Sequence, residues 1–347
     1  MKNKKIAIIG HFGGNKDFFD GQTVKTKIIY EELLKIKQNE IICVDTFYKS
    51  EKPMKLFWAS LQALVVTNDV VVLLSGNGMR LYFPVLYLCS KLFHKNVFHD
   101  VIGGNLDGYV EKYPLFKRYL NSFKVNWVET ELLKKKLLKL GINNCEVIPN
   151  FKRLYINYDI DESVAIEPFR FCTFSRVMKE KGIEDAIEAI RSINIKERRI
   201  ICTLDIYGVI DNGYKEEFVK LMNEVPEYIS YKGVVPYSDS VNAIKDSYAL
   251  LFPTHWYGEG FPGTIIDAFS AGVPVICTDW NSNSEIVQND YNGVVYSGAG
   301  KELAEAIMHL INKKDNIKEM KKNCITSALK YQPDKYVSMI CDYINSI

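Results

Sequence analysis

The sequence predicts an α/β fold built from two doubly wound sheets. Short runs rich in β-branched and aromatic residues alternate with amphipathic segments, and several runs are almost entirely apolar, as at 70–74. Such strands are typical of a parallel sheet whose two faces are both covered by helices. The alternation breaks once, near residues 152–168, and then restarts. We therefore expect two sheets of this kind, one in each half of the chain.

Twelve segments have the length and composition of strands, and several segments between them have helical periodicity. Val24–Lys37 and Gly182–Ile193 each place isoleucine and leucine or alanine on one face, the pattern of an amphipathic helix. The predicted strands are Ile6–Gly10, Glu40–Val44, Val70–Leu74, Lys95–Phe98, Trp127–Glu129, Cys145–Ile148, Arg170–Phe174, Ile200–Tyr207, Ile229–Lys232, Ala249–Phe252, Pro274–Thr278 and Gly293–Tyr296.

The length of 347 residues also suggests two domains, since a domain averages about 150 residues. We assign residues 1–160 to an N-terminal domain and residues 161–333 to a C-terminal domain. The last segment, 334–347, has apolar residues at helical spacing, and we expect it to pack back on the N-terminal domain.

Composition excludes several classes of protein. The chain has 44 Lys and Arg against 42 Asp and Glu, a net charge of +2, which argues against a nucleic-acid-binding polycation. The longest apolar stretch, Leu61–Leu74, contains Asn68 and Asp69 and is too short to span a bilayer. The eight cysteines form no C-x-x-C pair and mostly lie in apolar runs. We expect buried thiols in a cytoplasmic protein.

Two basic residues follow the first predicted strand of the second half. Arg176 and Lys181 lie in the loop between that strand and the next helix. Ligands of doubly wound sheets bind beyond the carboxyl ends of the strands. Two cations near a helix N-terminus would suit a diphosphate. Taken alone, an ordinary solvated loop explains them equally simply.

A glycine-rich loop follows the predicted strand that ends at Phe252. It contains Glu259 between two glycines, and a helix pattern starts near Thr264. The backbone N–H groups of Gly263 and Thr264 could bind phosphate oxygens. Asp267 has an ordinary alternative, because Thr264 and Asp267 have the spacing of a capping box.

Two further candidate sites lie in the first half. Gly21 and Gln22 precede the first long helix and follow Gly13-Gly14, which is typical of an anion-binding turn or of a simple loop. His99 stands at a predicted strand end before Gly103-Gly104. A single histidine there is more often structural than catalytic.

Motifs for other chemistries are absent from the sequence. There is no Walker-type phosphate loop and no H-E-x-x-H. Gly76-Asn77-Gly78 starts like a dinucleotide fingerprint, but Leu81 occupies the third glycine position. Ala268–Gly272 imitates a nucleophile elbow but follows a helix pattern instead of a strand. We expect an enzyme without metal or cofactor.

Taken together, the motifs resemble those of the retaining glycosyltransferases of family four. The match is sharpest where Glu259-Gly260-Phe261-Pro262 leads into Ala271–Ile276 and Glu285–Val287, and it is looser in the N-terminal half. The resemblance implies the GT-B fold, in which two Rossmann-like domains face each other across a cleft. It also implies that a sugar is transferred from a nucleotide diphosphate, with UDP as the expected nucleotide.

The resemblance assigns roles to most of the candidate residues. In the family an E-x7-E motif contacts the sugar with its first acid and the ribose with its second; Glu259 and Asp267 occupy these positions, with Asp in place of Glu. Arg176 and Lys181 match the diphosphate-binding pair, although Ser175 stands where glycine is usual. Gly21 and Gln22 match the loop beside the donor phosphates, and His99 matches the donor-sugar histidine by position. The implied catalytic set is Glu259, His99, Arg176 and Lys181, and the implied substrate-binding set adds Gly21, Gln22, Gly260, Phe261, Gly263, Thr264 and Asp267.

The acceptor leaves fewer traces. The basic amphipathic segment Glu131–Leu140 is either a solvated helix face or a loose contact with an anionic membrane that carries a lipid-linked acceptor. We expect a glycan or lipid-linked glycan acceptor and a role in cell-surface polysaccharide synthesis. Two alternatives remain, namely a sugar-nucleotide epimerase with the same diphosphate site and a non-catalytic sugar-nucleotide-binding partner.

Overall fold

The computed structural model describes residues 5–14, 21–37, 41–159 and 166–345. The chain divides into two compact units. Unit 1 comprises Met1–Arg153, Gly258–Phe261 and Gln332–Ile347, and unit 2 comprises Leu154–Tyr257 and Pro262–Tyr331. The first division therefore lies between Arg153 and Leu154, a few residues before the expected boundary at 160/161. The last segment belongs to unit 1.

Unit 1 contains a six-stranded parallel sheet in the order β2-β1-β3-β4-β5-β6. The strand order reverses between β1 and β3, and such a reversal is where doubly wound sheets bind ligands. The strands are β1 (Ile6–Gly10), β2 (Ile41–Asp45), β3 (Asp69–Leu73), β4 (Asn96–Asp100), β5 (Val125–Val128) and β6 (Cys145–Val147). The helices are α1 (Gly21–Lys37), α2 (Pro53–Val66), α3 (Gly76–Leu92), α4 (Leu106–Lys112), α5 (Leu115–Leu120), α6 (Glu131–Lys139) and α14 (Pro333–Asn345).

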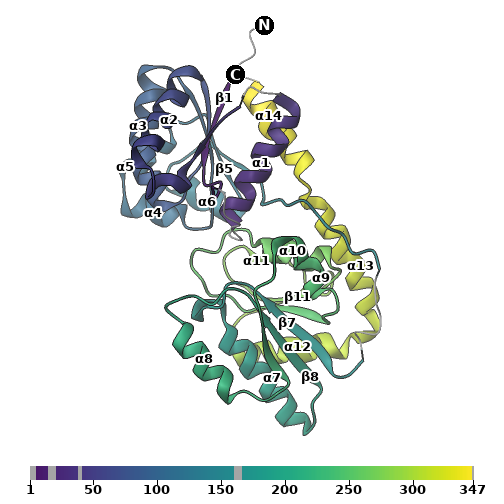
Figure 1. Ribbon diagram of the computed structural model, residues 1–347. Helices are drawn as coiled ribbons and strands as arrows, with labels where there is room; N and C mark the ends of the chain where they lie inside the picture. Colours follow the sequence, from purple (N-terminus) through teal and green to yellow (C-terminus); the bar gives the residue numbers. More distant parts are fainter. Residues whose placement is uncertain (1–4, 15–20, 38–40, 160–165, 346–347) are drawn as a thin grey trace. The chain divides into compact units, whose positions relative to one another are not determined.

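Helices cover both faces of this sheet (Figure 1). On one face, α2, α3, α4, α5 and α6 pack their buried residues against alternate residues of the strands. On the other face, α1 contributes Ile29 and Leu33, and α14 contributes Tyr336, Val337 and Ile340. Helix α14 packs directly against α1. The strands are buried on both sides, which explains why the sequence shows continuous apolar runs there.

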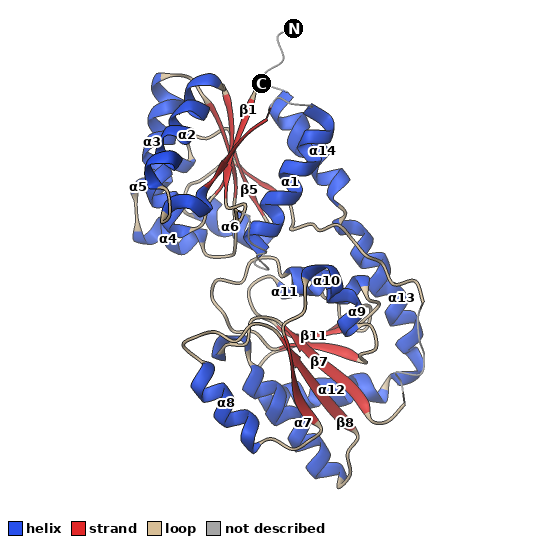
Figure 2. Cartoon of the chain, viewed as in Figure 1, coloured by secondary structure: helices blue, strands red, loops and turns tan. Residues whose placement is uncertain are grey.

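Unit 2 contains a second six-stranded parallel sheet, in the order β12-β11-β10-β7-β8-β9. Figure 2 labels β7, β8 and β11 of this sheet. This is the Rossmann strand order, with the reversal between β7 and β10. The strands are β7 (Phe169–Phe174), β8 (Cys202–Tyr207), β9 (Ile229–Gly233), β10 (Ala249–Phe252), β11 (Val275–Thr278) and β12 (Gly293–Tyr296). The helices are α7 (Ile183–Glu197), α8 (Lys215–Glu224), α9 (Ser240–Ile244), α10 (Gly263–Ser270), α11 (Asn283–Ile286), α12 (Gly300–Asn312) and α13 (Ile317–Ala328).

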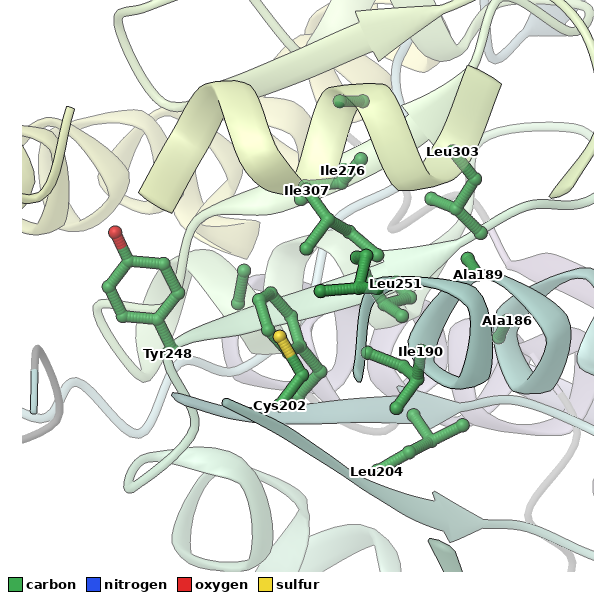
Figure 3. Packing of buried hydrophobic residues seen from close by; sticks show 14 of the residues in the cluster. Ala186, Ala189, Ile190, Cys202, Leu204, Tyr248, Leu251, Ile276, Leu303 and Ile307 are labelled. Carbon is green, nitrogen blue, oxygen red and sulfur yellow. The ribbon is translucent and has the colours of Figure 1, made fainter. Parts of the chain in front are cut away.

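The core of unit 2 lies between the sheet and helices α7 and α12. Ile190 of α7 and Ile307 of α12 are both fully buried and point toward the strands (Figure 3). Burying an isoleucine or leucine side chain contributes about 1.5–3 kcal/mol. The hydroxyl of buried Tyr248 donates a hydrogen bond of 3.0 Å to the carbonyl of Leu310, so the ring is buried without an unsatisfied donor.

The twelve predicted strands all form, with ends shifted by up to a few residues. The apolar stretch Leu61–Leu74 contains the end of α2 and all of β3. Gly76-Asn77-Gly78 begins helix α3 instead of a dinucleotide loop. All eight cysteines are free thiols; six are buried, whereas Cys43 on edge strand β2 is exposed. Within the described ranges, the structure contains no helix long and apolar enough to cross a membrane.

Candidate functional site

In unit 2, Arg176 and Lys181 both follow β7, at the point where the strand order reverses. Arg176 is exposed, and its guanidinium has no hydrogen-bond or ion-pair partner among the described residues. Lys181 is buried, with its Nζ 4.9 Å from the ring centre of Trp256 and 5.4 Å from that of Phe252. The rings fix the lysine by cation–π contact. The two cations thus differ, since one is held in place and the other is available to an anion.

Two glycines bring the neighbouring loops close to this point. Gly182 follows Lys181 at a φ of 69°, and a Cβ there would collide with the carbonyl of Pro253 at the end of β10. Gly208, at a φ of 139° after β8, has no room for a Cβ because the carbonyl of Ser175 lies against it. Positive φ and close backbone contact both require glycine. A side chain at either position would displace the loop that carries Arg176.

Helix α10 begins at the same edge of the sheet. Its Thr264 hydroxyl donates a 2.5 Å hydrogen bond to the carbonyl of Phe174, which fixes the helix start to the end of β7. Within the described part of the chain, the N–H groups of Gly263 and Thr264 have no protein acceptor. Free N–H groups at a helix N-terminus attract anions.

The capping-box alternative for Asp267 does not hold. The helix N-cap is Pro262, so Thr264 is the second helical residue and its hydroxyl bonds to Phe174 instead of the helix backbone. Asp267 lies further along the same helix, buried. Helix capping therefore does not explain why an acid stands at this position.

The loop Gly258–Phe261 belongs to unit 1, although the chain on both sides of it belongs to unit 2. Three hydrogen bonds hold it there. Gly104 donates to the carbonyl of Gly258 at 3.2 Å, Asn150 donates to the carbonyl of Phe261 at 3.1 Å, and Phe261 donates to Glu129 Oε2 at 3.1 Å. Gly104 also lies so close to Glu259 that a Cβ would overlap its carbonyl oxygen. Glu259 is thereby fixed in a buried position, 7% exposed.

Glu129 belongs to a buried ionic network. Lys25 Nζ of helix α1 lies 2.7 Å from Asp100 Oδ1 and 3.1 Å from Glu129 Oε1, and all three side chains are buried. Burial alone would lower the pKa of Lys25, but the two carboxylates outweigh it and raise the pKa. One cation serves two acids, and burial raises the pKa of Asp100 to about 6 despite Lys25. The network fixes the carboxylate of Glu129, which accepts the hydrogen bond from the Phe261 N–H.

His99 lies in β4, near the strand end where the sequence predicts it. Its ring is fully buried, Nδ1 is 3.0 Å from Asn126 Oδ1, and Phe83 and Phe123 contact it edge-on. Burial lowers the pKa of His99 to about 4. The imidazole has no exposed surface in this conformation, and its Nε2 has no hydrogen-bond partner among the described residues. The aromatic contacts fit a packing role, and the contact of His99 with a donor sugar stays a prediction.

Gly21 and Gln22 form the start of helix α1, beside the reversal between β1 and β3. The Gln22 side chain donates to the carbonyl of Leu73 at 3.2 Å, and Gly21 is exposed with open space around it. The preceding turn is held by Asp45, which accepts from the N–H groups of Phe12 and Gly14 at 2.9 and 2.8 Å. The rest of that loop, 15–20, lies outside the described residues.

The sequence reasoning missed Lys25, Glu129 and Asp45. A signal was present for Lys25, a lysine shortly after the small-residue turn at the start of a helix, and for Glu129, an acid at the end of an apolar strand. Neither position reveals its partner, because Lys25 and Glu129 are 104 residues apart. Among the described residues, no group of three or more His, Cys, Asp or Glu side chains is arranged to hold a metal ion.

The predicted site residues fall into two sets. Unit 2 brings Arg176, Lys181, Gly263, Thr264 and Asp267 onto the segments that follow β7 and β10. Unit 1 contains Gly21, Gln22, His99, Glu259, Gly260 and Phe261. A doubly wound sheet with cations and free helix N–H groups at its reversal point is typical of a nucleotide-binding protein.

Comparison with known proteins narrows this class. Residues 159–330 match the family model described as "Glycosyl transferases group 1". The alpha-galactosylglucosyldiacylglycerol synthase of Streptococcus pneumoniae is 24% identical over 255 residues, which cover 67% of this chain and 66% of the synthase. The match therefore spans slightly less than two thirds of that relative.

Two solved structures are similar over nearly the whole chain. HepE from Anabaena in complex with UDP has a TM-score of 0.75 at 14% identity, covering 99% of this chain and 100% of HepE. Sucrose-phosphate synthase from Thermosynechococcus elongatus has a TM-score of 0.76 at 14% identity, covering 99% and 98%. The chain has the GT-B fold. Its C-terminal part, residues 159–330, is similar to the group 1 glycosyl transferases, in line with the family-four resemblance.

Proposed function

We propose that this protein is a retaining, metal-independent glycosyltransferase that moves a sugar from a UDP-sugar to a hydroxyl of a glycan or lipid-linked glycan. The observation that carries the proposal is the composition of the β7–β10 reversal point in unit 2. This point has two cations: Arg176, which is exposed and has no partner among the described residues, and Lys181, which is held by aromatic rings. It also has the free N–H groups at the start of α10. This combination suits a diphosphate, which carries negative charge on several oxygens.

The chemistry assigned to unit 2 is stabilisation of the leaving group. The bond between the sugar C1 and the diphosphate oxygen breaks, and the electron pair departs with the diphosphate. Arg176, Lys181 and the amides of Gly263 and Thr264 stabilise the developing charge in place of a metal ion. Asp267, in the middle of the same helix, accepts hydrogen bonds from the ribose hydroxyls.

The chemistry assigned to unit 1 is orientation of the sugar. Glu259, with Gly260 and Phe261 beside it, is held by Gly104, Glu129 and Asn150 and contacts the transferred sugar. The acceptor oxygen forms the new bond to C1 on the face from which the diphosphate leaves, so configuration is retained. The acceptor proton passes to the departing phosphate oxygen. His99, whose ring is enclosed here, would contact the sugar only if its surroundings shifted.

The comparisons support the substrate class. HepE was solved with UDP and with UDP-glucose, and the pneumococcal relative is named as a glycolipid synthase. By analogy we assign a UDP-sugar donor and an acceptor attached to lipid or to a growing glycan. A role in capsule or lipopolysaccharide assembly, on the cytoplasmic face of the membrane, fits such an acceptor.

A thermal-shift screen tests the donor site. The full chain is heated with UDP, GDP, ADP and CMP and with their common sugar conjugates, in the absence of metal. A ligand at 100 times its dissociation constant stabilises the protein by about 2.7 kcal/mol. We expect the UDP compounds to give the largest shift and Arg176→Ala to abolish it. No shift with any nucleotide would contradict the proposal.

Product analysis then separates the transferase from the two alternatives. Incubation of the stabilising sugar nucleotide with glycan and glycolipid acceptors should give a lengthened acceptor and free nucleoside diphosphate. An isomerised sugar nucleotide would identify an epimerase, and an unchanged one would identify a binding partner. Retention is read from the anomeric configuration of the product by NMR.

A further inference from the structure

Helices α2 and α3 of unit 1 are apolar on their outer sides as well as on the sides that face the core. The exposed side chains recur every three or four residues, so they form one stripe along each helix. On α2 the stripe is Met54, Phe57, Trp58, Leu61 and Val65, and on α3 it is Leu81, Val85, Leu88 and Leu92, followed by Phe93. We call these residues together the α2–α3 surface.

The two stripes belong to one side of unit 1. Helices α2 and α3 both cover the face of the sheet opposite α1 and α14 (Figure 1). A buried hydrogen bond of 2.8 Å between the Ser60 and Tyr82 hydroxyls joins the two helices beneath the stripes. Phe57 and Trp58 are 57% and 61% exposed, which is unusual for neighbouring large aromatic residues on a helix. Two helices joined in this way, each with an exposed apolar stripe, are typical of a contact site.

The charged residues around the α2–α3 surface are mostly basic. From Thr46 to Lys95 the chain has more basic residues than acidic ones, and one of the two acids, Asp69, is fully buried in β3. Neither α2 nor α3 contains an acid. The exposed basic residues of this stretch are Lys49, Lys52, Lys55, Arg80 and Lys91. Apolar side chains with mainly basic residues around them match the boundary between acyl chains and anionic headgroups.

Helix α6, which contains the basic segment that the sequence suggests for a membrane contact, has few exposed apolar side chains. Its Leu133 and Leu137 are buried in the core. Its Lys134 lies 3.2 Å from Glu146, and its Lys136 lies 3.2 Å from Asp107. The basic residues of α6 are therefore partly neutralised, and only Leu138 is a large exposed apolar side chain on it.

We propose that the α2–α3 surface docks this protein on an anionic lipid bilayer. Trp58, Phe57 and their neighbours insert at the headgroup level, and the surrounding lysines bind the lipid phosphates. The occupant is inferred from charge complementarity, since two helices without acids match a partner that carries negative charge. The inference does not depend on sugar transfer, so it can be tested on protein of any activity.

The test is flotation of the full chain with vesicles of phosphatidylcholine alone or mixed with phosphatidylglycerol. We expect binding to the mixed vesicles, weaker binding to phosphatidylcholine, and release at high salt. The double variant Phe57→Ser with Trp58→Ser should lower the partition coefficient at least about tenfold. Leu138→Ser on α6 and Ile195→Ser on α7 remove similarly exposed apolar side chains and should leave it unchanged.

Trp58 gives a second readout on unmodified protein. Vesicles with brominated acyl chains should quench its fluorescence, and Trp58→Phe should remove that component of the quenching. The double variant should retain the wild-type melting temperature, because both side chains are exposed.

Three outcomes would overturn the proposal. The first is that wild-type protein does not bind phosphatidylglycerol vesicles, and the second is that the double variant binds them as well as wild type does. The third is that light scattering shows a dimer for wild type and a monomer for the double variant. The last would show that the α2–α3 surface is an interface between copies of the chain.

Discussion

Unit 1 encloses its central lysine, whereas unit 2 leaves the arginine at its strand ends exposed. Lys25 is buried between Asp100 and Glu129, and Arg176 has no protein partner within the described residues. A buried charge must be compensated inside the protein, because transfer from water is costly. An exposed charge can stay unpaired until a ligand arrives. The comparison indicates that unit 1 uses charge to hold backbone in place and unit 2 uses charge to bind.

The largest effect should come from breaking the buried network. Lys25→Met leaves Asp100 and Glu129 buried without a cation, and we expect a loss of about 3–5 kcal/mol in the free energy of unfolding. Urea denaturation followed by circular dichroism measures it. Lys134→Met removes an exposed pair with Glu146 in the same unit and should cost less than about 1 kcal/mol. Equal costs for the two variants would mean that the network is not special.

The pH dependence of stability should identify the buried His99. Its pKa is about 4 in the folded protein, against an ordinary value of 6.5 for a solvated histidine, so the unfolded state binds its proton first. Above pH 6.5 the imidazole is neutral in both states and does not lower the free energy of unfolding. As the pH falls from 6.5 toward 4, the unfolded state takes up the proton and the free energy of unfolding decreases. The shift corresponds to about 3 kcal/mol. Asp100 acts in the opposite direction, because its raised pKa makes stability fall as pH rises toward 6.

The contribution of His99 can be isolated by difference. We expect the free energy of unfolding of wild type, minus that of His99→Leu, to decrease as the pH falls from about 7 to about 4. Only wild type has an imidazole whose protonation favours the unfolded state. Urea titrations at several pH values measure this gap. A gap that is constant with pH would show that the ring is accessible to protons in the folded state.

The binding charges should matter for turnover. We expect Arg176→Ala and Lys181→Ala each to lower kcat by about 100-fold or more, the scale of losing one donor that stabilises transition-state charge. Lys179→Ala, in the same loop, is the matched control, since Lys179 is exposed and pairs with Glu217. Near-normal turnover in both site variants, or an equal loss in the control, would refute the diphosphate assignment.

The smallest effect concerns the loop that carries Glu259. Gly104→Ala places a methyl group against the Glu259 carbonyl and should destabilise the protein by about 1–3 kcal/mol while lowering kcat. Gly213→Ala, in an exposed turn of unit 2, should change neither quantity appreciably. Urea denaturation and a transfer assay measure both. Unaltered turnover in Gly104→Ala would mean that the contact with Gly104 does not set the position of Glu259.

The fold could be predicted from sequence because both sheets are buried on both faces. The apolar runs at β3 and β10, with glycine or polar residues after them, define strands without any knowledge of their neighbours. Helix α3 cannot be predicted from local propensity, since Gly76, Gly78 and Pro84 are poor helix formers. Burial of Met79, Phe83 and Leu86 outweighs their propensities.

The site was only partly predictable. Arg176 and Lys181 follow β7 directly in the chain, so strand-end reasoning found them. Lys25, Asp100 and Glu129 come from three separate segments, and only the folded sheet brings them together. His99 was assigned by position along the chain, but the alternation of side chains along β4 turns its ring into the core.

Helix α14 has a consequence for the order of events during synthesis. Tyr336, Val337 and Ile340 fill the core of unit 1 beside Ile6 and Trp127, which are translated about 200 residues or more earlier. All strands and helices of unit 2 leave the ribosome before those side chains do. Domains usually fold in the order in which they are synthesised. Here unit 1 is the first to be synthesised, but its core is completed only after unit 2 has been made. Until then, the apolar groove that α14 will cover on α1 and the sheet must be kept from aggregating.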